Sequence, residues 1–175
     1  EGNLRTRTMI VHPSRLQEKH EKYFQWINTR KKYWEKIFAP TYGEEDKAKE
    51  IKSFEEAYDD LKKNINNLPS FKEVVEKLEY AIHKTVVQQV NGISGGNTVD
   101  FESTYAHILV GGEALDRGFT VEGLTVTYMP RSTKNATNAD TLQQRARFFG
   151  YKKDYIGFCR VYLSEKNKEL FKAYI

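Results

Sequence analysis

The sequence predicts an α/β fold in which helices cover both faces of a mostly parallel β-sheet. Short apolar runs that end near a glycine or a proline recur along the chain, and amphipathic helical patterns separate them. The chain has 175 residues, of which 39% are hydrophobic and 30% are charged. This length and composition are typical of a single globular domain that buries its own core.

Five apolar or β-branched runs are expected to form the strands. The first run is ended by Pro13, because proline cannot continue the ladder of backbone hydrogen bonds. Later runs end in Gly111-Gly112 and in Pro130, which also stop a strand. The expected strands are MIV (9–11), TVVQQV (85–90), AHILVGG (106–112), LTVTYMP (124–130) and FCRVYLS (158–164).

Helical patterns connect these strands. We expect a helix over Arg15–Phe38 with Ser14 as its cap, and another over Glu44–Asn67, where apolar residues recur every three or four positions. Further helices are expected after a capping box formed by Ser70 and Glu73, over about 138–149, and from a Ser164 cap to the end of the chain.

The unusual residues of the sequence follow the ends of the expected strands. In a parallel sheet these ends meet at one edge, where α/β proteins bind their ligands. Glycines at this edge either let the backbone approach a ligand closely or only relieve strain in a tight connection. The residues are His12, Ser14, Asn91, Gly92, Gly112, Arg117, Gly118 and Arg131. We expect a functional edge there.

A second dense group of polar residues is DTLQQRARFFGY, Asp140–Tyr151. On a helix Gln143 and Arg147 share one face, and Gln144 neighbours Arg147, whereas Arg145 points elsewhere. Apolar residues between them are spaced to hold the helix against the sheet. A solvated charged face is the alternative, but the glutamines and arginine favour a binding helix.

Composition excludes several classes of protein. The single cysteine, Cys159, excludes an internal disulfide framework and a multi-cysteine zinc site, and we assign no metal ligands. We therefore expect a reducing, cytoplasmic setting, with no membrane contact because no apolar run approaches the roughly 20 residues of a membrane helix. The net charge of +4 and pI near 9.0 are compatible with a nucleic-acid partner. No Gly-Lys-Ser or Gly-Lys-Thr of a P-loop occurs.

Two segments together carry a resemblance to a known family. GGEALDRGFTVEGLTVTY (111–128) and DTLQQRARFFGY (140–151) resemble motifs five and six of superfamily-two helicases and translocases. More closely, they are similar to the Z-one domain of proteins classed as bacterial endonucleases, and MIVHPSR (9–15) resembles the first strand of that domain. The resemblance thins out over about 40–84, which we expect to be a helical insertion in a single C-terminal RecA-like domain of three layers.

The resemblance implies one half of an ATP-dependent motor. Superfamily-two motors bind ATP between two RecA-like domains, and only the first carries a P-loop. This chain resembles the second, so the implied partners are an N-terminal RecA-like domain of the same longer chain and DNA. ATP and Mg²⁺ would bind the parent protein, which we expect to act in a restriction or defence system. This half alone would hold no cofactor tightly and would not hydrolyse ATP.

The resemblance also assigns roles to residues. Arg147 matches the first arginine of motif six and is the expected catalytic arginine finger. ATP contacts are assigned to Gly112, Arg117, Gly118, Thr120, Gln143, Gln144 and Lys152, and nucleic-acid contacts to His12, Ser14, Asn91, Gly92 and Arg131. Two positions depart from the helicase pattern: Gly150 replaces the second arginine, and Thr120 stands where many helicases have an aspartate.

Two other functions remain open on the sequence. One is a stand-alone magnesium nuclease that uses Asp100 and Glu102, and the other is a degenerate RecA-like interaction module that binds through its helical block. The aromatic and basic run Tyr23–Trp34 fits a helix that packs into the core better than one that stacks bases.

Overall fold

The computed structural model describes residues 6–14, 16–40, 42–90, 99–112, 115, 120–130 and 152–172. The helix expected at about 138–149 lies outside these residues. The elements follow the order β1 (Arg7–Val11), α1 (Gln17–Ile37), α2 (Glu44–Lys62), α3 (Phe71–Lys84), β2 (Thr85–Val90), β3 (Ala106–Gly111), β4 (Leu124–Met129), η2 (Ile156–Phe158), β5 (Arg160–Leu163) and α5 (Glu165–Lys172).

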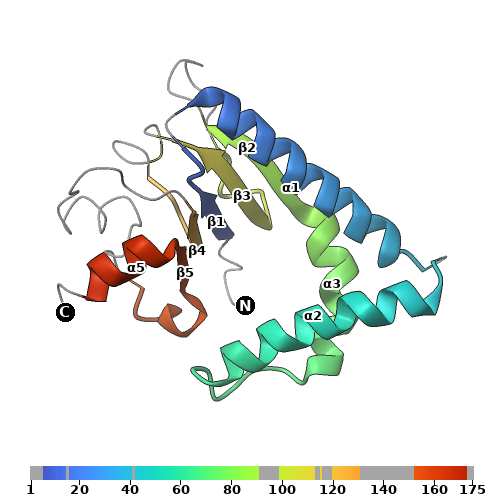
Figure 1. Cartoon of the computed structure of the whole chain (residues 1–175). Helices are drawn as coiled ribbons and strands as arrows, with labels where there is room; N and C mark the ends of the chain where they lie inside the picture. The colour runs from blue at the N-terminus through green and yellow to red at the C-terminus, as the bar shows by residue number, and fades with distance from the viewer. Residues whose placement is uncertain are drawn as a thin grey trace.

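The strands form one sheet in the order β2-β3-β1-β4-β5, and every neighbouring pair is parallel. From the central β1 the chain runs to the edge strand β2, returns to β3, and then crosses to β4 and β5 on the other side. The order of connections therefore reverses beside β1, which is where parallel α/β sheets bind ligands. Figure 1 shows α1 and α5 on opposite sides of the sheet.

The predicted α/β class with a parallel sheet flanked by helices is confirmed, and it is consistent with a three-layer RecA-like arrangement. Alternate residues of the strands fill the core, since successive side chains of a strand point to opposite faces. Ile10 of β1 and Leu109 of β3 are fully buried, together with Leu115. Val90, Leu124 and the partly buried Val99, Phe101 and Val121 complete this cluster.

The helices α1, α2 and α3 share a second hydrophobic cluster. Ile37 and Phe38 at the end of α1 pack with Leu78 and Ile82 of α3. Phe54 of α2 contacts the rings of Trp34 and Phe38, with centroids 5.2 and 5.6 Å away. Figure 1 shows α2 and the first turns of α3 extending away from the sheet, while the end of α3 leads directly into β2. These two helices lie within residues 40–84, where a helical insertion is predicted.

Two of the three expected serine caps are confirmed. Ser70 and Glu73 form the capping box of α3, and Ser164 Oγ accepts from the backbone N–H of Asn167 in α5 at 3.4 Å. The cap predicted at Ser14 is wrong, because α1 begins two residues further on, with Leu16 as its N-cap. Ser14 Oγ instead accepts from the backbone N–H of Leu16 at 3.2 Å and so shapes the turn before the helix.

Candidate functional site

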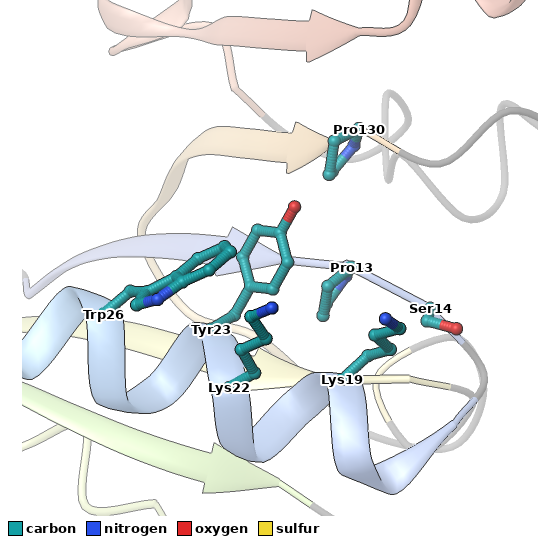
Figure 2. Close-up of a pocket in the computed structure, with 7 residues that line it drawn as sticks. All are labelled: Pro13, Ser14, Lys19, Lys22, Tyr23, Trp26 and Pro130. Atoms are coloured by element: carbon teal, nitrogen blue, oxygen red, sulfur yellow. The ribbon is translucent and has the colours of Figure 1, made fainter.

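Strand ends and one helix face enclose a pocket at the carboxyl edge of the sheet. Pro13 and Ser14 follow β1, and Pro130 follows β4. The remaining lining residues, Lys19, Lys22, Tyr23 and Trp26, come from the first half of α1, and the pocket has a volume of about 310 Å³. Figure 2 shows the Tyr23 hydroxyl pointing toward Pro130, with both lysines on the same side of the helix. The predicted functional edge is thus a hollow surface.

The four residues from α1 are spaced to face one way. Positions 19, 22, 23 and 26 lie three, four and seven residues apart, which is one stripe of an α-helix. The β1–α1 turn places this stripe beside the strand ends because Pro13 stops β1 and Ser14 holds the backbone of Leu16. The turn and the helix periodicity together build the pocket wall.

Two aromatic rings line one part of the pocket. The Tyr23 and Trp26 ring centroids are 5.1 Å apart and tilted by 53°, and Tyr23 also lies 6.5 Å from the ring of Tyr128 on β4. Burial, with Tyr128 as a second cause, raises the pKa of the Tyr23 phenol, so it stays protonated at neutral pH. Trp26 remains 53% exposed. The expectation that the aromatics of α1 pack inside therefore holds for Trp34 but not for Trp26.

The two lysines give the pocket a positive charge. Among the described residues, no carboxylate lies within 4 Å of either Lys19 or Lys22 in an ion pair. The nearby Glu21 is engaged elsewhere: it accepts from Gln25 at 2.6 Å and from Gln89 at 2.5 Å, and these bonds lower its pKa. Lys22 Nζ lies 4.9 Å from the centre of the Trp26 indole ring. The positive charges of Lys19 and Lys22 are therefore available to an anion.

Gly112 lies behind the pocket, against a buried histidine. His20 Nε2 donates to the backbone carbonyl of Ser14 at 2.8 Å. A Cβ on Gly112 would lie 2.8 Å from the same imidazole and 3.1 Å from the Ser14 carbonyl. The glycine lets β3 approach the β1–α1 turn, and this packing accounts for it without a ligand. The predicted ATP contact of Gly112 stays a prediction.

His12 and Ser14 reach the predicted edge in different ways. His12 is only 4% exposed, and its backbone N–H donates to the backbone carbonyl of Tyr128 at 2.8 Å. His12 therefore belongs to the sheet interior. Ser14 is half-buried and lines the pocket directly. Of His12 and Ser14, Ser14 is the residue that lines the pocket.

Thr120 and Lys152 do not join this group. Thr120 is exposed on the segment that enters β4. In the same segment the backbone carbonyl of Glu122 accepts a hydrogen bond from the Thr8 hydroxyl at 2.7 Å. Lys152 begins the turn that leads toward β5. In that turn the ring centroid of Tyr155 lies 5.3 Å from the guanidinium carbon of Arg7. Both segments lead toward the amino ends of the strands, opposite the pocket. The other predicted site residues, Arg147, Arg117, Gly118, Gln143, Gln144, Asn91, Gly92 and Arg131, lie outside the described residues.

Asp100, one of the two acidic residues considered for a nuclease, has a structural role. Asp100 Oδ1 accepts from the backbone N–H groups of Glu102 and Ser103 at 3.1 and 3.0 Å, and the Ser103 hydroxyl bonds to Oδ2. These bonds lower the pKa of Asp100 and hold the turn before β3. In the part of the chain that the structure describes, no three His, Cys, Asp or Glu side chains gather to hold a metal ion.

A second cavity of about 260 Å³ lies between α1, α3 and the sheet and is largely apolar. Its two basic residues are already paired: Arg30 with Glu50 at 2.9 Å, and Lys31 with Glu35. The pocket at the carboxyl edge is the stronger candidate because its cations are not neutralised in this way. Across the described ranges, no helix has the length and apolar character needed to span a bilayer.

Sequence reasoning missed Lys19 and Lys22. The signal that identifies them is their spacing from Trp26 on a helix that directly follows a strand end. That signal is weak alone, because many helices carry lysines on a solvated face.

Comparison with known proteins identifies the family. No curated protein and no solved structure matches the chain. The family model of the Z1 domain, the Z-one domain named above, matches residues 1–175. Because the match covers the whole sequence, the chain belongs to the Z1 domain family.

Proposed function

We propose that this chain is the second RecA-like half of a cytoplasmic, ATP-dependent motor that acts on DNA. The observation that carries the proposal is the pocket at the carboxyl edge of a parallel sheet, with Lys19, Lys22 and Trp26 in its wall. Backbone phosphates bind lysines without regard to sequence, and exposed aromatic rings accept bases. The net charge of +4 agrees with a polyanionic partner.

We assign the binding of ATP to a second domain. In this proposal an N-terminal RecA-like domain of the same longer protein binds ATP and Mg²⁺, and ATP supplies the phosphoryl group that is transferred to water. Arg147 of this chain reaches across the interface and neutralises negative charge on that group. An arginine supplied in this way contributes about 10³–10⁵ to the rate. The resemblance of residues 140–151 to motif six supports this role.

The test is DNA-stimulated ATP hydrolysis by the full-length protein, wild type against Arg147→Ala. We expect kcat to fall at least about a hundredfold, because only the transition state develops the charge that Arg147 neutralises. Arg145→Ala is the matched control, since that side chain points to another face of the expected helix. Equal rates for wild type and Arg147→Ala, with folding intact, would contradict the proposal and favour an interaction module.

A further inference from the structure

The pocket has the shape and chemistry of a site for one unpaired nucleotide. Its wall combines a half-buried tyrosine, a tryptophan that is 53% exposed, and two lysines within about 310 Å³. An exposed indole ring beside two lysines matches a ligand that carries both a planar ring and a negative charge. A phosphate alone would not use the rings, and an apolar ligand would not use the lysines.

The placement of the lysines argues against a purely structural role. Lys19 lies in the first turn of α1, where the helix macrodipole disfavours a positive charge. A lysine there gains nothing from the helix and, within the described residues, forms no ion pair. An anion at the mouth of the pocket would relieve this repulsion and would meet the positive end of the same helix.

Trp26 has one partner that a ligand can replace. Lys22 Nζ lies 4.9 Å from the indole centroid, in a cation–π contact that is weak at an exposed site. A base that stacks on the indole would displace this ammonium, which can turn to the phosphate of the same nucleotide. Tyr23 does not move, because its ring is held between Trp26 and Tyr128. The wall at Tyr23 is therefore preformed, whereas the wall at Trp26 and Lys22 can rearrange.

We propose that this pocket binds one nucleotide of single-stranded DNA, with its base stacked on Trp26 and its phosphate between Lys19 and Lys22. This inference rests on the proposed function and adds that the strand is unpaired where it meets α1. In a duplex both faces of each base are covered by neighbouring bases, so no base can lie against the indole. Ser14 and Pro130 line the pocket from the strand ends.

The test is equilibrium binding of fluorescent oligonucleotides to the full-length protein. The probes are an oligothymidylate of about ten nucleotides, a strand of equal length whose residues are all abasic, and a duplex. We expect the oligothymidylate to bind most tightly and Trp26→Ala to weaken it about 5- to 100-fold, with little effect on the abasic strand. Trp26→Phe should restore most of the affinity, because phenylalanine retains a stacking face.

A second variant separates the contribution of charge to the binding affinity from that of base stacking. Lys19→Ala combined with Lys22→Ala should weaken the oligothymidylate and the abasic strand alike, and should reduce the salt slope by about 0.7, because one phosphate contact is lost. The control is Lys32→Ala with Tyr33→Ala, a basic and aromatic pair exposed further along α1. This control should bind as wild type. An oligouridylate that binds more tightly, with the same losses, would support the pocket and identify the strand as RNA.

Three results would overturn the inference. Equal binding of single strand and duplex, unchanged in Trp26→Ala, would leave a DNA-acting protein but remove the stacking site. Competition by ATP for the oligothymidylate, lost in Trp26→Ala, would make the pocket a mononucleotide site. Absence of binding to every oligonucleotide would contradict both this inference and the proposed function.

Discussion

Gly112 and His20 show how a glycine at a strand end can serve packing alone. The imidazole of His20 lies in the space where a side chain at position 112 would begin, 2.8 Å from the ideal Cβ. His20 is only 3% exposed and is held by the carbonyl of Ser14. The ring therefore cannot move aside without breaking the turn that forms one wall of the pocket.

We expect Gly112→Ala to destabilise the fold by about 1–3 kcal/mol, because overpacking a closed site forces its neighbours to shift. The urea midpoint of unfolding measures this loss. Gly43→Ser is the control: nothing lies within 4 Å of a Cβ at Gly43, and helix N-caps favour serine. If Gly112→Ala unfolds at the wild-type midpoint, the contact with His20 is not a packing constraint.

The connection between α1 and α2 depends on one buried carboxylate. Glu50 of α2 is 6% exposed and accepts from Arg30 at 2.9 Å and from Trp34 Nε1 at 2.7 Å. Arg30 in turn lies over the Trp34 ring, 4.9 Å from its centroid. The same carboxylate thus orients a guanidinium and an indole, and it joins two helices that otherwise meet through apolar contacts.

Glu50→Ala is expected to reduce the free energy of unfolding by about 1.5–3 kcal/mol, because it leaves the Trp34 indole N–H and the Arg30 guanidinium without their acceptor. Glu55→Ala, an exposed position on the same helix, should change it by less than about 0.5 kcal/mol. Chemical unfolding of both variants is the measurement. Equal effects would show that Glu50 does not join the helices.

On the scale of the whole molecule, α2 spans from α1 to the far edge of the sheet. Arg160 of β5 donates from Nε to Asp60 Oδ2 at 2.6 Å and from a terminal nitrogen to the Asp60 carbonyl at 3.1 Å. A Cβ on Gly157 would lie 2.8 Å from Ile65, so the two segments are in close contact there. These contacts join the end of α2 to the edge strand β5, and Asp60 and Arg160 are 100 positions apart in the sequence.

This ion pair predicts a dependence of stability on pH. Arg160 holds the pKa of the Asp60 carboxyl below its ordinary value, chiefly through their hydrogen bond. The native state therefore binds fewer protons, so the contribution is complete above the ordinary pKa and is lost as the pH falls through the lowered one. We expect wild type to be more stable than Asp60→Asn at neutral pH, with the difference shrinking below about pH 4.

Urea midpoints of the two proteins, measured from about pH 7 to about pH 3, test this dependence. Asp59→Asn, the exposed neighbour, is the control and should follow the wild-type curve. Added salt should reduce the Asp60 effect, since the pair is partly open to solvent. A difference that stays constant down to the lowest pH would mean that the ionised carboxylate is not what stabilises the contact.

Among the described elements, local patterns were sufficient for the strands and for most helix bounds, but only partly for the site. The capping box at Ser70 and the β-branched run Thr85–Val90 each depend on neighbours in the sequence, and both were predicted correctly. Parallel strands also place Ser14 and Gly112 at one edge, as expected. The resemblance assigned Thr120 and Lys152 to the ATP site together with Gly112, but they lie on segments that approach the opposite ends of the strands.

The sequence by itself determined the alternation of strands and helices and the parallel sheet, because hydrophobic periodicity and turn residues act over a few positions. Only the tertiary structure decided that Trp26 stays exposed while Trp34 is partly buried, that His20 fills the space beside Gly112, and that Arg160 meets Asp60. These outcomes depend on which surfaces meet when distant segments pack, and no local pattern carries that information.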